Sequence, residues 1–330
     1  MEDVAVVMDG VRVLFAGPAA ERPDRTDDEQ SFDGFLMPGV VDRHVHIGLS
    51  DPRAVLAGGV TAVRDLGWPP DDILFMAEQS ESPSFDGPLI RAVGPIVTCR
   101  GGYPSNAGWA PNGTASEVAG PEEAAEVVRQ MLVASGLPVV KIALNSEAGP
   151  TLSDAELLAI CDTAHEAGAI VTAHLQGKGQ VERALGAGVD EAAHCPWTEE
   201  LSASVVAAMA ARMRVVSTLD IHSYGRDTPA LRAALSNLGR FVQAGGTVAY
   251  GTDLGNGPIP PGIHVTEAWH LLRAGLSIER ILTAMTFRPL QAGEPAMMVL
   301  LGADPREDLN ALGDVRAVWR DGVRVKPLER

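Results

Sequence analysis

The sequence predicts an α/β protein: a (β/α)8 TIM barrel with a small β-sandwich formed by the N- and C-terminal segments. From residue 38 to about residue 290, short β-branched runs alternate with Ala- and Leu-rich segments, which indicates repeated βαβ units. Eight such runs fall in this stretch of about 250 residues, the usual size of this barrel. Each end of the chain also carries a hairpin pattern, so we expect a further β layer outside the barrel.

The two hairpin patterns read VAVVMDGVRVLF near the N-terminus and VRAVWRDGVRV near the C-terminus. In each, alternating apolar residues flank an Asp-Gly pair, which favours a tight hairpin turn. An isolated hairpin is only marginally stable in water, so we expect the two to pair into one small β layer. The predicted domains are the β-sandwich, residues 1–37 and 291–330, and the barrel, residues 38–290.

The candidate barrel strands follow one another along the chain. In order they read GVVDRHVHI, GVTAVRDLG, LIRAVGPIVT, PVVKIAL, AIVTAHL, GVDEAAHC, RVVSTLD and TVAYGTD. Between them, segments such as EEAAEVVRQMLVASG and DAELLAICDTAHEAG place apolar residues at helical spacing and end in Gly, as amphipathic crossover helices do. A doubly wound open sheet is the alternative, but no G-x-G-x-x-G follows the first strand.

The composition excludes several classes of partner. The 330 residues include 46% hydrophobic and 21% charged residues, and the formal net charge of −17 would repel nucleic acid and an anionic membrane. No apolar run reaches the roughly 18 residues of a membrane span, and the N-terminus lacks a signal peptide's positive charge. Cys99, Cys161 and Cys195 do not suggest a disulfide framework. We expect a cytoplasmic protein that acts on a small molecule; assembly into a homo-oligomer stays open.

The residues at the strand ends indicate a functional site. Reactive side chains of such a barrel lie at the C-terminal ends of its strands. In PGVVDRHVHIG, His44 and His46 are two residues apart, so both imidazoles point to the same side of a strand, as metal binding requires. Polar residues at the ends of the candidate strands include the set His44, His46, Lys141, His174, His194 and Asp253. A set that includes four of the eight histidines favours function over structure.

These residues also carry a family resemblance. With PGVVDRHVH, GVTAVRDLG, VVKIAL, VTAHLQGKGQVERALGAGVDEAAH and YGTDLGN, nearly the whole chain resembles the amidohydrolase superfamily of metal-dependent hydrolases. It is most similar to the imidazolonepropionase-like and Xaa-Pro-dipeptidase-like branch, which has a carboxylated lysine on strand four. The resemblance implies that Lys141 is the carboxylated, metal-bridging lysine. It also implies a set of metal ligands comprising His44, His46, His174, His194 and Asp253.

The chemistry explains these residue types. Imidazoles suit Zn²⁺, and a carboxylate or carbamate can bridge two ions. Lys141 follows Val139 and Val140 in an apolar strand, so its pKa should be depressed and the neutral amine can capture CO₂. The expected cofactors are two divalent metal ions, zinc first, and a CO₂-derived carbamate on Lys141. As in the family, Asp253 would ligate one ion and act as general acid and base.

The predicted function is binuclear, metal-dependent hydrolysis of an amide C–N bond by a metal-bridging hydroxide. An N-acyl amino acid, a dipeptide or a cyclic amide would be the substrate, and a lactone or ester on the same site is the alternative. A mononuclear deaminase is disfavoured, because Gly177 stands where such enzymes usually have a catalytic glutamate. A catalytically silent barrel used for assembly is also disfavoured, because such proteins typically lose ligands and this chain retains all six.

Several loop residues are candidates for substrate contacts. Tyr103, where related enzymes often have histidine, either donates a hydrogen bond to the substrate carbonyl or caps an apolar pocket with Trp109. Arg100 is the candidate for a substrate carboxylate. His222 is a candidate catalytic and substrate-binding residue as an oxyanion donor, and His264 is a candidate on the leaving-group side. Substrate identity depends on the shapes of these loops.

Overall fold

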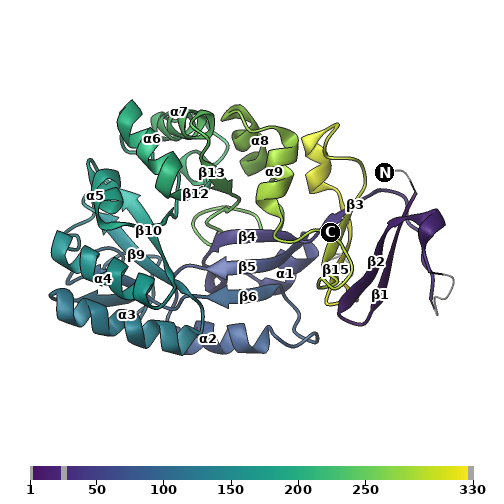
Figure 1. Cartoon of the computed structure of the whole chain (residues 1–330), viewed down its shortest axis with the longest axis horizontal. Helices are drawn as coiled ribbons and strands as arrows, with labels where there is room; N and C mark the ends of the chain where they lie inside the picture. The colour runs from purple at the N-terminus through teal and green to yellow at the C-terminus, as the bar shows by residue number, and fades with distance from the viewer. Residues whose placement is uncertain (1–2, 24–27, 326–330) are drawn as a thin grey trace.

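The computed structural model describes residues 3–23 and 28–325. Its centre is a barrel of parallel strands with helices on the outside (Figure 1). All eight predicted strands form, and the third is divided into two short strands. The barrel strands are β4 (Val40–Val45), β5 (Val60–Asp65), β6 (Leu89–Ala92) with β7 (Ile96–Cys99), β9 (Val139–Asn145), β10 (Ile170–Gln176), β11 (Glu191–Ala192), β12 (Arg214–Val216) and β13 (Thr247–Ala249).

Two sheets make up the barrel wall. One has the order β4-β5-β6, and the other runs β13-β12-β11-β10-β9-β7 and ends on an added strand, β8 (Ala115–Val118). The third barrel strand joins the two sheets, because β7 follows β6 after three residues. On the opposite side, β4 bonds to the segment after β13: Asp253 N donates to His44 O at 2.8 Å, and His46 N donates to Leu254 O at 2.7 Å.

The helices pack around the barrel, as the crossover pattern predicts (Figure 1). The two helical segments quoted from the sequence are α3 and α4; α3 ends on Gly136 in the left-handed conformation, and α4 begins with a capping box of Ser153 and Glu156. The helices are α1 (Pro52–Ala57), α2 (Pro70–Gln79), α3 (Pro121–Ser135), α4 (Asp154–Glu166), α5 (Gln180–Ala187), α6 (Ala203–Arg212), α7 (Pro229–Gln243), α8 (Val265–Arg273) and α9 (Ile278–Met285). The 3-10 turns are η1 (Ala19–Glu21), η2 (Ile47–Leu49), η3 (Asp220–His222) and η4 (Leu309–Gly313). Among the described residues, no helix is both long enough and apolar enough to cross a membrane.

The two predicted hairpins form, but they do not share one β layer. β1 (Val4–Asp9) and β2 (Arg12–Pro18) make a sheet of their own. The C-terminal hairpin, β15 (Val315–Arg320) and β16 (Val323–Val325), belongs to a second sheet with β14 (Met298–Leu301) and β3 (Phe35–Pro38). The expectation of a single layer is wrong because β14, which the pattern analysis missed, takes the free edge of β15.

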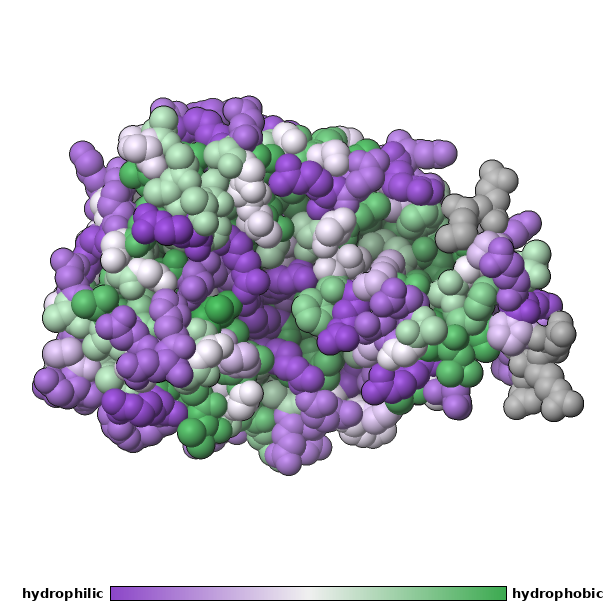
Figure 2. Space-filling view, viewed as in Figure 1, coloured by the Kyte–Doolittle hydropathy of each residue, from purple (hydrophilic) through white to green (hydrophobic). Residues whose placement is uncertain are grey.

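The two small sheets face each other beside the barrel and form the small β-sandwich (Figure 1). Val6 and Met8 of β1 pack against a buried cluster on the second sheet that includes Met298 and Trp319. Of the predicted sandwich segments, 1–37 and 291–330, residues 1–2, 24–27 and 326–330 lie outside the described residues. Hydrophilic side chains predominate on the face shown in Figure 2, with apolar ones scattered among them.

Candidate metal centre

The six predicted strand-end residues line one cavity of about 180 Å³ at the C-terminal ends of the barrel strands. All six side chains are buried. The six come from five different strands or from the segments that follow them, so only the assembly of the two sheets brings them together. They are His44, His46, Lys141, His174, His194 and Asp253.

His44 and His46 end β4 with their rings aimed at one carboxylate. The Nδ1 atom of His44 lies 2.7 Å from Ala193 O, and that of His46 lies 2.9 Å from Gly67 O. A ring nitrogen that faces a carbonyl carries the proton, so each Nε2 presents a lone pair. Both Nε2 atoms lie 3.3 Å from Asp253 Oδ1.

Asp253 follows β13 with a left-handed backbone, φ 60°. Its Oδ2 accepts a hydrogen bond from Asn256 Nδ2 at 3.0 Å, whereas its buried Oδ1 has no hydrogen-bond partner. Burial opposes ionisation, but His44 and His46 hold the pKa of Asp253 below its usual range. A carboxylate oxygen and two imidazole nitrogens that converge in a buried site need a cation between them, which is either a proton shared with an imidazole, as the lowered pKa of Asp253 reflects, or a metal ion. Their ligand atoms lie within 4.8 Å of one another, which suits a metal ion.

His174 and His194 form the opposite wall of the cluster. The His194 ring centroid lies 4.5 Å from that of His44 and 4.8 Å from that of His174. His194 Nδ1 lies 2.9 Å from Thr218 Oγ1, and His174 Nε2 lies 3.2 Å from Gln176 Oε1. Each ring therefore has one engaged and one available nitrogen. Burial lowers the pKa of His174 to about 3 and that of His194 far below its usual value, so both rings are neutral, the form that binds metals.

Lys141 extends from the middle of β9 into the same cavity. Its side chain is 1% exposed, and its Nζ has no hydrogen-bond partner. Burial lowers the pKa of the amine to about 7. A buried, unpartnered amine is costly as an ammonium ion, so the site fits the neutral or carboxylated lysine that the sequence implied.

Two of the predicted substrate contacts also line the cavity. Tyr103 stacks on His174, with ring centroids 4.8 Å apart, and its hydroxyl accepts a hydrogen bond from Trp109 Nε1 at 3.0 Å. His222 stacks on Trp197 at 4.4 Å, and its Nε2 is buried without a partner. Tyr103 therefore closes a wall of the cavity with Trp109, and its hydrogen bond to a substrate carbonyl stays a prediction.

A family model described as the amidohydrolase family matches residues 35–293, which is most of the chain. The chain belongs to the amidohydrolase family. The fold and hydrolase class predicted from the sequence are therefore confirmed. A comparison with curated proteins gave no match for this amidohydrolase.

Solved structures similar to this amidohydrolase span nearly its full length. An A. niger ochratoxinase has a TM-score of 0.80 at 21% identity, covering 98% of this chain and 91% of the other. A putative prolidase from Bifidobacterium longum has a TM-score of 0.80 at 25% identity, covering 98% and 89%. A Xaa-Pro dipeptidase solved with methionine in its active site has a TM-score of 0.82 at 20% identity, covering 98% and 95%.

Two predicted substrate contacts of the amidohydrolase lie elsewhere. Arg100 is exposed and is not among the residues that line the cavity. His264 is buried behind the cavity, where its Nε2 lies 2.7 Å from Asp220 Oδ2. Neither residue lines the cavity, so their contact with substrate stays a prediction that the cavity lining does not support.

Asp220 is the centre of a buried cluster that the sequence analysis did not find. It accepts hydrogen bonds from Ser223 Oγ at 2.7 Å and Gly225 N at 2.8 Å, and His270 Nε2 lies 3.3 Å from it. Glu267 of α8 accepts hydrogen bonds from the backbone N–H groups of Leu219 and Asp220, both at 2.9 Å. Helix α8 thus fixes turn η3, which carries His222 into the cavity.

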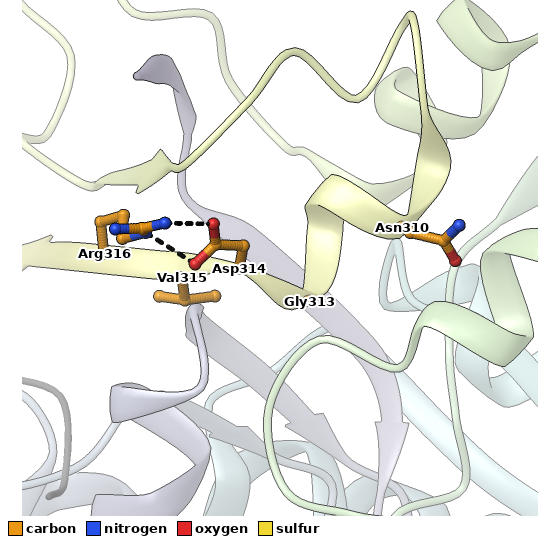
Figure 3. A pocket seen from close by; sticks show the side chains of 5 residues that line it. All are labelled: Asn310, Gly313, Asp314, Val315 and Arg316. Carbon is orange, nitrogen blue, oxygen red and sulfur yellow. Dashed lines mark hydrogen bonds and ion pairs between the residues drawn. The ribbon is translucent and has the colours of Figure 1, made fainter. Parts of the chain in front are cut away.

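A larger hollow lies apart from the ligand cluster. It measures about 630 Å³ and is lined by residues of η4 and β15, none of which lines the metal cavity (Figure 3). Arg316 donates to both carboxylate oxygens of Asp314 at 2.6 Å across its floor. With its charges paired in this way, the hollow offers no catalytic group comparable to the buried cluster.

Proposed function

We propose that this amidohydrolase binds two divalent metal ions, zinc first, and hydrolyses an amide C–N bond of a small molecule. One observation carries the proposal: Lys141 Nζ and Asp253 Oδ1 are buried without the partners that buried polar groups need, in one cavity that four imidazoles also line. One ion would be held by His44, His46 and Asp253. The second would be held by His174 and His194, with the carbamate of Lys141 bridging the pair.

Carboxylation of Lys141 follows from its surroundings. The neutral amine adds through its nitrogen to the carbon of CO₂ and loses one proton, which leaves an anionic carbamate. Burial, which lowers the pKa of Lys141 to about 7, supplies the neutral amine. The product has two oxygen donors where the ammonium ion had none.

The bound ions would polarise the scissile carbonyl and lower the pKa of a water molecule so that it attacks at neutral pH. Asp253 is ionised, so its carboxylate would accept the proton of the attacking water while it holds the ion. The same carboxyl group then delivers the proton to the nitrogen that leaves. Asn256, which donates to Oδ2, keeps Oδ1 turned towards the cavity.

Tyr103 and His222 orient the substrate. Burial raises the pKa of Tyr103, so its hydroxyl stays protonated, and the bond accepted from Trp109 leaves that proton free for the substrate carbonyl. Burial lowers the pKa of His222 to about 4, so the ring is neutral and its unpartnered Nε2 is the second contact. Both groups act on the carbonyl side, where negative charge develops during attack.

Elemental analysis of purified protein, together with a hydrolysis screen, tests the proposal. The screen covers N-acyl amino acids, dipeptides, simple anilides, lactams and lactones. We expect close to two divalent ions per chain and turnover of an amide. At most one ion under metal-replete, CO₂-containing conditions, or turnover of lactones alone, would contradict it.

A further inference from the structure

The residues that line the cavity of this amidohydrolase also indicate the class of its substrate. Two aromatic pairs line this cavity beside the ligand cluster. Trp109 lies 4.5 Å from the His46 ring and is bonded to Tyr103, while Trp197 stacks on His222 at 4.4 Å. These four flat side chains present ring faces and edges to whatever enters.

The same cavity offers no partner for an anionic group of the substrate. Among the described residues that line it, Lys141 is the one Lys or Arg, and the proposed function assigns it to the metal pair. Arg100, the sequence's candidate for a substrate carboxylate, lies exposed outside. A carboxylate brought in away from the metals would lose its hydration without gaining a counterion, which costs several kcal/mol.

The neutral polar residues of the wall are already engaged. Gln176 Oε1 accepts a hydrogen bond from Asn145 Nδ2 at 2.9 Å, and its Nε2 donates to Glu147 Oε2 at 2.9 Å. Asn256 donates to Asp253. Glu147 thus adds a negative charge next to the Gln176 side of the cavity, in a protein whose net charge is −17. Away from the proposed metal ions, the charges of the cavity lining and the net charge of the protein oppose an anionic group.

The volume of the cavity limits the size of the substrate group that it can hold. Its volume is about 180 Å³, and an apolar cavity of about 150 Å³ holds one benzene ring. Ile96 and Ile221 complete the lining with apolar surface. Because the proposed ions, carbamate and attacking water share this space, one planar ring beside the scissile bond is the largest group that we expect it to hold.

We infer that the substrate carries an uncharged aromatic ring next to the scissile C–N bond, as in an aryl amide, and lacks a carboxylate there. This inference rests on the proposed function and narrows it. It removes dipeptides and N-acyl amino acids, whose carboxylate lies close to the scissile bond, from the expected substrates.

The test compares acetanilide with 4-acetamidobenzoate, which differ by one carboxylate. Binding to the full-length, metal-loaded protein is measured by quenching of tryptophan fluorescence and by saturation-transfer NMR, so the readout does not depend on turnover. We expect acetanilide to bind at least about tenfold more tightly, because burial of an unpaired charge is unfavourable. Equal or tighter binding of the carboxylated compound would overturn the inference.

Matched tryptophan variants locate the ring. Trp109→Leu and Trp197→Leu should each weaken acetanilide binding about threefold to tenfold through loss of ring contacts. Trp269→Leu is the control, because Trp269 donates to Asn310 near the hollow of Figure 3 and does not line the cavity. Equal losses in all three variants, or none in any, would also overturn the inference. Circular dichroism verifies the fold of each variant, and the wild-type comparison needs no variant.

A variant that adds a cation to the cavity wall tests the charge argument directly. Ile221 lines the cavity and is only partly buried, so Ile221→Arg adds a cation to the wall. We expect 4-acetamidobenzoate binding to improve about tenfold relative to acetanilide. An unchanged ratio would count against the absence of a cation as the reason for selectivity.

The outcomes separate the two proposals. Faster hydrolysis of Ala-Pro or an N-acetyl amino acid than of acetanilide by the two-metal enzyme would refute the inference and leave the proposed function standing. A protein with at most one ion and no C–N hydrolysis would refute the proposed function. In that case the binding preference between the two probes still decides whether the cavity selects neutral rings.

Discussion

Two buried aspartates lie at the C-terminal ends of neighbouring barrel strands, and each faces two imidazoles. Asp253 follows β13 and faces His44 and His46, while Asp220 follows β12 and faces His264 and His270. The residue types are the same, but the hydrogen bonding is not. This difference separates a ligand cluster from a structural one.

The carboxylate of Asp220 is fully hydrogen-bonded by its neighbours. His264, Ser223 and Gly225 approach its oxygens to 2.7–2.8 Å. Arg273 Nη1 lies 3.3 Å from His270 Nδ1, so that nitrogen accepts and the proton of His270 is on Nε2, which faces Asp220. A carboxylate with this many donors needs no further partner and holds the turn η3 in place.

Asp253 is the opposite case. Its Oδ1 faces two ring nitrogens at 3.3 Å whose protons are on the far side of each ring. Asp253 Oδ1 and Lys141 Nζ are both buried without a hydrogen-bond partner. A metal ion would complete such a cluster, so this incomplete bonding supports the proposed metal site.

The largest expected effect belongs to Lys141. Lys141→Ala removes the bridging anion, so metal content should fall from two ions to one and turnover should drop at least about a hundredfold. Acetate or propionate should restore part of both, by entering the space left by the side chain. Thr172→Val, a buried residue opposite Lys141 in the strand register, is the control and should keep both ions.

Metal analysis and turnover assays on both variants check this prediction. Intact mass and ¹³C NMR of protein grown with labelled bicarbonate test the carbamate directly. An unmodified Lys141 in fully active, metal-loaded enzyme would show that the bridge is not needed.

The next effect compares the two aspartates directly. Asp253→Asn keeps an oxygen ligand but removes the base, so turnover should fall by about 10²- to 10⁴-fold while most metal stays bound. Asp220→Asn should lower turnover less, because Asp220 acts only by holding η3, which carries His222. Steady-state kinetics on metal-loaded variants measure both, and near-normal turnover of Asp253→Asn would remove it from proton transfer.

On stability, in contrast to turnover, the Asp220 substitution should have the larger effect. Asp220→Asn removes a buried carboxylate that accepts several hydrogen bonds, so the free energy of unfolding should fall by about 3 kcal/mol in urea denaturation. Asp227→Asn is the control, because its pair with Arg232 is exposed on both sides and should contribute less than about 1 kcal/mol. Equal losses in the two variants would mean that the Asp220 cluster is not a structural anchor.

The smallest effect is the pH dependence of that loss. Burial favours the protonated form of Asp220, but hydrogen bonds from His264, His270 and Ser223 hold its pKa below the usual value near 4. A lowered pKa gives stability that is present above the unfolded-state value and disappears as pH falls through the folded-state value. The difference in unfolding free energy between wild type and Asp220→Asn should therefore be constant above pH 5 and shrink towards pH 3. A difference that grows on acidification would contradict the assignment.

The sequence did not predict where the loop side chains lie in the folded protein. Arg100 and His264 were predicted to contact substrate from their positions after strands, yet one is exposed and the other is bonded to Asp220. Asp220 itself lay within a quoted strand pattern without attracting notice. Its partner His264 is 44 residues away, and no local pattern links the two. Likewise β14, a continuous apolar run, was missed and changed how the hairpins pair.

The sequence by itself determined the barrel, the hairpins and the candidate ligands, because each depends on local order. Side chains alternate along a strand, and all parallel strands end on one side of a barrel, so chain position alone predicts that the strand-end residues meet. Only the tertiary structure decided which nitrogens and oxygens there remain without partners, and which loop residues reach the cavity. Those outcomes depend on contacts between segments distant in the chain, such as Asp253 with β4 and α8 with η3, which form only when the barrel closes.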